Sequence, residues 1–161
     1  MKRLVVLGGG ESGIGTALLG KAKGYEVFVS DKGIIVEKYK EVLVNNEIDW
    51  EDEKHTEALI LNADLVMKSP GIPEKVEMVQ KLFQKGIPVI SEIEFASAFT
   101  QANIIGITGS NGKTTTATWT DYVLKNGGLN VALAGNIGDS FAKAVWKDKV
   151  EHYVLELSSF Q

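Results

Sequence analysis

The sequence predicts an α/β protein built on doubly wound parallel sheets, with one complete domain followed by part of a second. Three observations carry this prediction. Short apolar segments alternate with helix-like segments, glycines gather in two loops, and each loop stands between an apolar segment and a helix. Apolar segments without polar alternation are typical of strands that are covered on both faces. Their alternation with helices favours a doubly wound sheet.

Residues 1–100 are expected to form the complete, Rossmann-like domain. The expected strands are short and apolar, at 4–7, 27–29, 65–67 and 89–90. The expected helices lie between or after them, at 13–23, 36–45, 74–84 and 92–99. In the third helix the apolar positions recur at the spacing of one helix face. Segment 50–54 is acidic and predicts an exposed connection. The acids around it lack the glycine and terminal glutamate of a calcium loop, so they are expected to be solvated: Asp49, Glu51, Asp52 and Glu53.

A domain boundary is expected near residues 99–103, where a second series of strands and helices begins. Its expected strands are 104–107, 131–133 and 153–156, and its expected helices are 113–125 and 140–145. Three strands are about half of a nucleotide-binding domain, and a sheet that stops there has an unpaired edge. Residues 101–161 are therefore expected to be the truncated start of a phosphate-loop ATPase-type domain, in a fragment of a longer protein.

Composition excludes several classes of function. Seventeen lysines and arginines against 21 acids give a net charge of −4, and the only arginine is Arg3. Such a surface does not attract nucleic acid over a broad face. The absence of cysteine removes disulfide frameworks and thiol catalysis. Neither a signal peptide nor a membrane-spanning run is present in the sequence. A cytoplasmic protein with no nucleic-acid partner and no membrane association is expected.

The second glycine loop predicts phosphate binding. Thr108-Gly109-Ser110-Asn111-Gly112-Lys113-Thr114 follows an apolar strand and opens a helix. Glycines let backbone N–H groups approach a phosphate, and the helix N-terminus adds favourable charge. Lys113 is expected to reach the β- and γ-phosphates, and the Thr114 hydroxyl to bind Mg²⁺. Glu156 ends an apolar strand, where α/β folds place ligand-binding groups, and is the second predicted metal ligand.

The first glycine loop predicts binding of a diphosphate. Residues 8–13 fit the pattern Gly-x-Gly-x-x-Gly after a strand, and Asp31 ends the next strand. Taken alone, this pattern indicates a dinucleotide such as NAD. It certifies only a close approach of backbone to a diphosphate, however, and ligands of the UDP type carry one too.

Four segments together resemble one family. Residues 109–115 resemble the ATP loop of the Mur ligases and folylpolyglutamate synthetases, and 135–138 resemble the second glycine motif of that superfamily. Residues 155–161, Leu-Glu-Leu-Ser-Ser-Phe-Gln, and 69–72, Ser-Pro-Gly-Ile, are similar to the Mur ligases that add D-glutamate. The resemblance covers the whole chain.

The resemblance implies roles for individual residues. The uridine-nucleotide substrate would be bound by residues of the first glycine loop and of two strand ends: Gly8, Gly10, Glu11, Ser12, Gly13, Asp31, Ser69, Pro70 and Gly71. The sugar and the muramoyl-alanine end would lie near Asn136, Ser158, Ser159 and Gln161. ATP would be bound by Gly109, Ser110, Asn111, Gly112, Lys113, Thr114 and Thr115. Lys113 and Glu156 would act in catalysis, with Thr114 and Glu156 on Mg²⁺.

The resemblance also implies the reaction and its participants. ATP would phosphorylate the alanine carboxylate of UDP-N-acetylmuramoyl-L-alanine, and the D-glutamate amine would displace phosphate from the acyl phosphate. Mg²⁺ and Lys113 would neutralise the charge that develops. The full-length enzyme would work as a monomer in peptidoglycan precursor synthesis. The family's carbamylated lysine, metal-binding histidine and D-glutamate domain would lie beyond Gln161, so the chain alone is expected to be inactive.

Two other classes remain open from the residues themselves. An NAD-dependent oxidoreductase would use the first loop but leaves residues 109–114 unexplained. A regulatory nucleotide-binding module would bind without turnover.

Overall fold

The computed structural model describes residues 1–147 and 149–158 and contains two parallel sheets. The first has five strands in the order β3-β2-β1-β4-β5, and the second has three in the order β6-β8-β7. The first order is that of a Rossmann-like sheet, in which the direction of winding reverses between β1 and β4. The predicted α/β fold class is confirmed.

The first sheet carries helices on both faces. Its strands are β1 (Arg3–Leu7), β2 (Glu26–Ser30), β3 (Asp49–Glu51), β4 (Leu65–Lys68) and β5 (Val89–Ile90). Its helices are α1 (Glu11–Ala22), α2 (Glu37–Asn45), α3 (Glu57–Ile60), α4 (Glu77–Gln84) and α5 (Glu92–Ser97). Alternate residues of β1 point into two cores: Leu4 and Val6 pack with α1, α2 and α5, while Val5 and Leu7 pack with α3 and α4.

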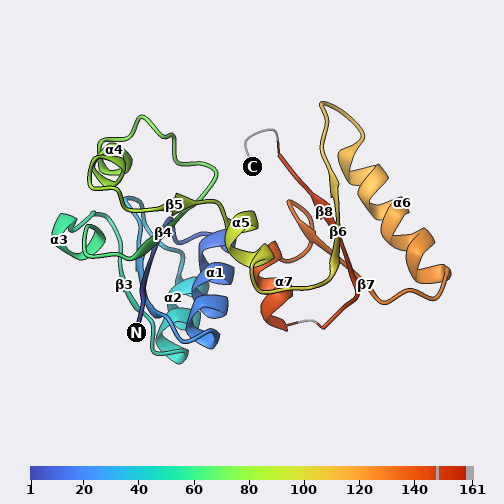
Figure 1. The fold of residues 1–161 in the computed structure, drawn as a ribbon, viewed down its shortest axis with the longest axis horizontal. Coiled ribbons are helices and arrows are strands. Elements are labelled where there is room, and N and C mark those ends of the chain that lie inside the picture. The colour runs from blue at the N-terminus through green and yellow to red at the C-terminus, as the bar shows by residue number, and fades with distance from the viewer. Residues whose placement is uncertain (148, 159–161) are drawn as a thin grey trace.

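The second sheet has three strands and is also covered on both faces. It contains β6 (Asn103–Ile107), β7 (Val131–Gly135) and β8 (His152–Glu156), with helices α6 (Lys113–Asn126) and α7 (Phe141–Lys147). In Figure 1, α6 lies on the outer side of this sheet and α7 on the side that faces the first sheet. β6, which carries the second glycine loop, is an edge strand, and its Ile104 is 41% exposed.

The two sheets share one hydrophobic core through α1 and α7. The side chains of Ala17 and Leu18 from α1, Phe141 from α7 and Tyr153 from β8 belong to the same buried cluster. Figure 1 shows α5 and α7 between the two sheets, beside α1. The two series of strands are therefore joined by a packed interface as well as by the segment between α5 and β6.

One predicted connection is wrong. Segment 50–54 was expected to be exposed, but residues 49–51 form β3, which pairs in parallel with β2. Glu51 was expected to be solvated and is only 7% exposed. Its carboxylate accepts hydrogen bonds from the Ser30 hydroxyl and from the Thr56 N–H and hydroxyl. Burial alone would raise the pKa of Glu51, but the bonds from Thr56 and Ser30 outweigh it and lower that pKa.

No helix in the described ranges, 1–147 and 149–158, is long and apolar enough to span a bilayer.

Candidate functional site

The first glycine loop lies at the carboxyl end of β1, where the sheet reverses its winding. Gly8 has a φ of +100°, and a Cβ built on it would lie 2.5 Å from the Ser69 Oγ at the end of β4. Glycine is therefore needed at this position for its conformation and for the close approach of the two strand ends. Ligands of open α/β sheets bind at such reversal points.

A pocket of about 350 Å³ opens between these strand ends. It is lined by eight of the nine first-domain residues that were predicted to bind substrate, together with Ile72: Gly8, Gly10, Glu11, Ser12, Asp31, Ser69, Pro70, Gly71 and Ile72. Ile72 belongs to the Ser-Pro-Gly-Ile segment at 69–72 and was not predicted to bind substrate. The ninth predicted residue, Gly13, lies behind the pocket and is buried in α1.

Gly13 holds the glycine loop against α1. A Cβ built on Gly13 would lie 1.8 Å from the Gly8 carbonyl oxygen, a backbone atom that cannot move aside alone. We therefore expect Gly13→Ala to destabilise the chain by about 3 kcal/mol. Thermal unfolding should show a melting temperature lower by roughly 6–12 °C.

Gly10→Ala is the matched control, because Gly10 has a φ of −83° and a Cβ there meets nothing within 4 Å. Equal melting temperatures for the two variants would contradict the packing role of Gly13.

Asp31 and Glu11 are both engaged within the protein. The Asp31 carboxylate accepts from the Gly9 N–H at 2.6 Å and from the Gly33 N–H at 2.8 Å, so it fixes the glycine loop. Glu11 accepts from the Tyr39 hydroxyl at 2.8 Å and from the Lys143 Nζ at 3.0 Å. Burial would raise the pKa of Glu11, but these two partners lower it.

The second glycine loop begins directly after β6 and ends at the start of α6. Gly109 and Gly112 have φ values of +147° and +74°, which L side chains rarely adopt. The Lys113 Nζ donates to the Gly109 carbonyl oxygen at 2.7 Å, so the ammonium group lies over the loop. Thr114 and Thr115 are exposed in the first turn of α6, as are Ser110 and Asn111 in the loop.

Glu156 lies beside this loop at the end of β8. It is level with Ile107 of β6 on one side and with Gly135 of β7 on the other. It is 6% exposed, and its Oε2 is buried with no hydrogen-bond partner among residues 1–147 and 149–158. A buried carboxylate oxygen without a partner is costly in a folded protein, so such an oxygen is typical of a group that serves a ligand.

The residues present fit a magnesium ion at this position. Magnesium sites commonly use one or two protein ligands together with substrate phosphates. The Glu156 carboxylate and the Thr114 hydroxyl flank the loop that is predicted to bind phosphates. Within residues 1–147 and 149–158, no group of three or more His, Cys, Asp or Glu side chains is placed to form an all-protein metal site.

Two of the remaining predicted substrate residues, Asn136 and Ser158, do not line the first pocket. Asn136 is exposed at the end of β7, and its N–H donates to the Glu156 carbonyl oxygen at 2.9 Å. Ser158 is half-buried two residues after Glu156. Ser159 and Gln161 lie outside the described residues. The structure therefore brings Asn136 next to Glu156, while the glycine-loop pocket is lined by first-domain residues.

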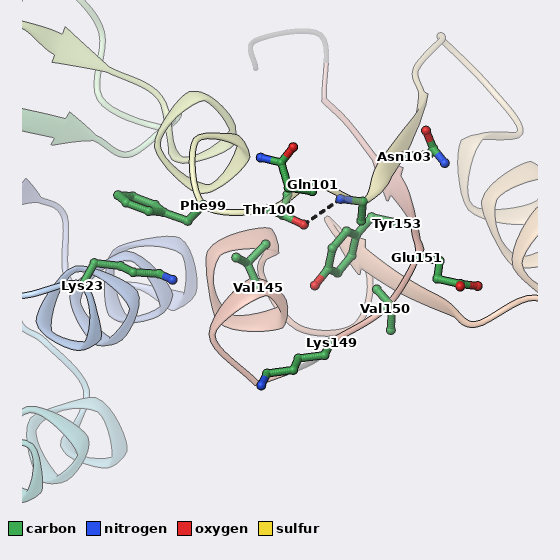
Figure 2. Close-up of a pocket in the computed structure, with 11 residues that line it drawn as sticks. Lys23, Phe99, Thr100, Gln101, Asn103, Val145, Lys149, Val150, Glu151 and Tyr153 are labelled. Atoms are coloured by element: carbon green, nitrogen blue, oxygen red, sulfur yellow. Dashed lines mark hydrogen bonds between the residues drawn. The ribbon is translucent and has the colours of Figure 1, made fainter.

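A wider pocket of about 590 Å³ lies along the segment that joins the two sheets. Figure 2 shows Phe99, Thr100 and Gln101 on one side of it, with Val145 and Tyr153 on the other. None of the residues predicted to bind substrate or ATP lines this pocket. We assign the candidate site to the two glycine loops, because the residues predicted to bind substrate line the pocket at the first loop and Lys113 and Glu156 lie at the second.

Two buried or half-buried contacts between α1, α5 and α7 were not predicted from the sequence. Glu92 of α5 is 2% exposed and accepts a hydrogen bond from the Ala142 N–H. Lys143 joins Glu11 to Asp139 across the interface of α1 and α7. The sequence signals neither contact, since Glu92 stands in the first turn of a helix, where an acid is ordinarily a solvated capping group.

Comparison with known proteins identifies the family of this chain. Residues 3–78 match the MurD N-terminal domain, and residues 107–161 match the Mur ligase middle domain. UDP-N-acetylmuramoylalanine–D-glutamate ligase of Christiangramia forsetii is 62% identical over 160 residues, which are 99% of this chain and 36% of that protein. The protein of the same name from Bacteroides thetaiotaomicron is 56% identical over 161 residues, again 36% of its length.

Solved structures agree on the fold. UDP-N-acetylmuramate:L-alanyl-γ-D-glutamyl-meso-diaminopimelate ligase of Neisseria meningitides superposes with a TM-score of 0.65 at 21% identity, covering 100% of this chain and 55% of that one. UDP-N-acetylmuramate–alanine ligase of Thermotoga maritima gives a TM-score of 0.61 at 20% identity, covering 98% and 37%. The chain spans about a third of the length of the curated relatives it matches. Because residues 3–78 and 107–161 match two successive Mur ligase domain models, the chain belongs to the Mur ligase family.

Proposed function

We propose that the full-length protein is an ATP-dependent amide ligase that joins D-glutamate to UDP-N-acetylmuramoyl-L-alanine in peptidoglycan precursor synthesis. We further propose that it works as a monomer in the cytoplasm. In this proposal, residues 1–100 bind the uridine-nucleotide substrate, and residues 101–161 supply the phosphate loop of the ATP site. The observation that carries it is the unpartnered buried oxygen of Glu156 beside the phosphate loop, in a chain whose first domain has a separate pocket at a glycine loop.

The chemistry begins with transfer of a phosphoryl group. A carboxylate oxygen of the substrate attacks the γ-phosphorus of ATP, ADP leaves, and an acyl phosphate results. Backbone N–H groups of the loop and the Lys113 ammonium bind the phosphate oxygens as their charge redistributes. Mg²⁺ held by Thr114 and Glu156 would supply charge neutralisation between two anions.

Amide formation follows at the carboxyl carbon of the substrate, which is now the acyl carbon of the acyl phosphate. The D-glutamate amine attacks the acyl carbon, the C–O bond to phosphate breaks, and the amine loses its proton. In this proposal Asn136 and Ser158, with Ser159 and Gln161, lie toward the muramoyl-alanine end of the substrate. Asn136 is suited to this role because it lies at the same sheet edge as Glu156.

Calorimetry on the full-length protein tests the assignment of the first pocket. We expect UDP to bind more tightly than NAD, because the glycine loop shares this pocket with the segment Ser69-Pro70-Gly71, which resembles that of the Mur ligases. NAD binding as tight as UDP binding would contradict the proposal.

A pair of variants checks the location of this binding. Gly71→Leu should weaken UDP binding at least tenfold and leave ATP binding unchanged, since a Cβ at Gly71 enters open space at the pocket. Gln101→Leu, in the wider pocket along the segment that joins the two sheets, should change neither the UDP affinity nor the ATP affinity.

A further inference from the structure

Glu92 is a buried carboxylate that contacts both domains. It is the first residue of α5, on the side of the first sheet, and is 2% exposed. One carboxylate oxygen accepts from the Ala142 N–H of α7 at 2.8 Å, and this contact joins residues 50 positions apart. Ser12 and Ser140 also lie beside this carboxylate, and hydrogen bonding from their side chains lowers the pKa of Glu92.

These donors belong to the two loops that the proposed function assigns to substrate. Ser12 is the second residue of α1 and lies in the glycine loop of the first pocket. Ser140 directly precedes α7 and Ala142 is its second residue, just after the loop that carries Asn136. A single side chain therefore connects the loop proposed to bind the uridine nucleotide with the loop proposed to bind the muramoyl end.

The surrounding interface leaves little room for another arrangement. A Cβ built on Gly15 of α1 would lie 2.2 Å from the Ser140 Oγ and 2.9 Å from the Lys143 backbone nitrogen. The backbones of α1 and α7 thus meet directly beside Glu92. Lys143 also forms ion pairs with Glu11 and Asp139 at this interface, but these side chains are half-exposed. Ion pairs of that kind contribute little to stability.

Burial has an electrostatic consequence for Glu92. It raises the pKa of this carboxyl group, and the bonds from Ala142, Ser12 and Ser140 offset only part of that effect. Keeping a carboxylate in this position costs stability. That cost is consistent with a positional task at the interface.

We propose that Glu92 is a positioning residue that holds the Gly8–Gly13 loop and the Asn136 loop in one fixed relation. It would thereby set where the carboxylate of the uridine-nucleotide substrate arrives relative to ATP. Glu92 itself would touch neither substrate nor ATP. This inference rests on the proposed function.

The test uses Glu92→Ala in the full-length enzyme. We expect kcat to fall at least 30-fold and the affinity for UDP-N-acetylmuramoyl-L-alanine to fall at least tenfold. UDP alone and ATP alone should each bind within twofold of wild type, because each needs the loop of a single domain. Glu92→Gln keeps an acceptor for the Ala142 N–H and should restore kcat to within fivefold of wild type.

Glu94→Ala is the matched control. Glu94 lies on the same short helix, and its carboxylate accepts from the Ser91 N–H in an exposed capping box. This variant should leave kcat and the substrate affinity within twofold. If Glu92→Ala does not fold, Ser140→Ala removes one donor from the same contact and should lower kcat in the same direction by at least threefold.

A distance measurement separates positioning from catalysis. Spin labels at Lys38→Cys and Thr118→Cys, in an otherwise cysteine-free background, report on exposed sites in the two domains. Wild type should give one narrow distance distribution, and Glu92→Ala a broader one. An unchanged narrow distribution, or unchanged kinetics in Glu92→Ala, would overturn the inference. A wild-type enzyme that does not bind the uridine nucleotide would instead refute the proposed function, whatever the distances show.

Discussion

Lys113→Ala in the full-length enzyme is expected to lower kcat by about 10²–10³-fold. The Lys113 Nζ lies over the phosphate loop, 2.7 Å from the Gly109 carbonyl oxygen. A lysine at this place acts on charge that develops as the phosphoryl group transfers, so its loss should reduce transition-state stabilisation. Steady-state kinetics with ATP varied at saturating second substrates measure this loss as kcat and kcat/KM.

The same variant should bind the uridine nucleotide normally, because the first pocket lies in the other domain. Lys125→Ala is the control on the same helix, since Lys125 pairs with Asp121 at the far end of α6. This control should keep wild-type kcat. If Lys113→Ala kept more than a tenth of kcat, about 1.4 kcal/mol or less would be at stake, and its catalytic role would be wrong.

Glu156→Gln is expected to separate activity from stability. Removing the carboxylate charge beside the phosphate loop should lower kcat by about 10²-fold and raise the Mg²⁺ concentration needed for half-maximal rate. The free energy of unfolding should stay the same or rise. Glu156 has an unpartnered buried oxygen, and a neutral amide costs less to bury than a charge. Magnesium titrations of the rate and urea unfolding of the same sample provide both measurements.

Glu151→Gln serves as the comparison for that pair of measurements. Glu151 is exposed and directly precedes β8, at the opposite end of the strand from Glu156. Its substitution should change neither kcat nor the magnesium requirement. A Glu156→Gln variant that unfolds at lower urea with near-normal kcat would assign Glu156 to the structure and remove it from the metal site.

Much of the fold followed from the sequence because its signals are local. The strand Val89–Ile90 was expected at 89–90, and Glu37–Asn45 was expected as a helix at 36–45. The first glycine pattern was also expected directly after a strand, and the structure has it at the end of β1. Its signal is local because Gly8 has a positive φ that favours glycine. Such signals are set by neighbouring residues and need no tertiary information.

The missed features depend on partners far along the chain. Strand β3 has an acidic sequence, Asp-Trp-Glu, and becomes a strand because β2 offers an edge and Thr56 satisfies the Glu51 carboxylate. Glu92 reads as a helix-capping acid, and only the approach of Ala142 turns it into a buried contact. Acidic residues are ordinarily exposed, so the pattern could not predict either burial.

The two hydrogen bonds to Asp31 have a consequence for how this acid can face a nucleotide. In many dinucleotide-binding folds the acid at this strand end accepts hydrogen bonds from a ribose diol. Here one carboxylate oxygen of Asp31 accepts from the Gly9 N–H and the other from the Gly33 N–H. Each oxygen can accept two hydrogen bonds, so each keeps one acceptor site for a ligand. The backbone bonds that shape the loop thus also fix the direction in which this carboxylate would face a nucleotide.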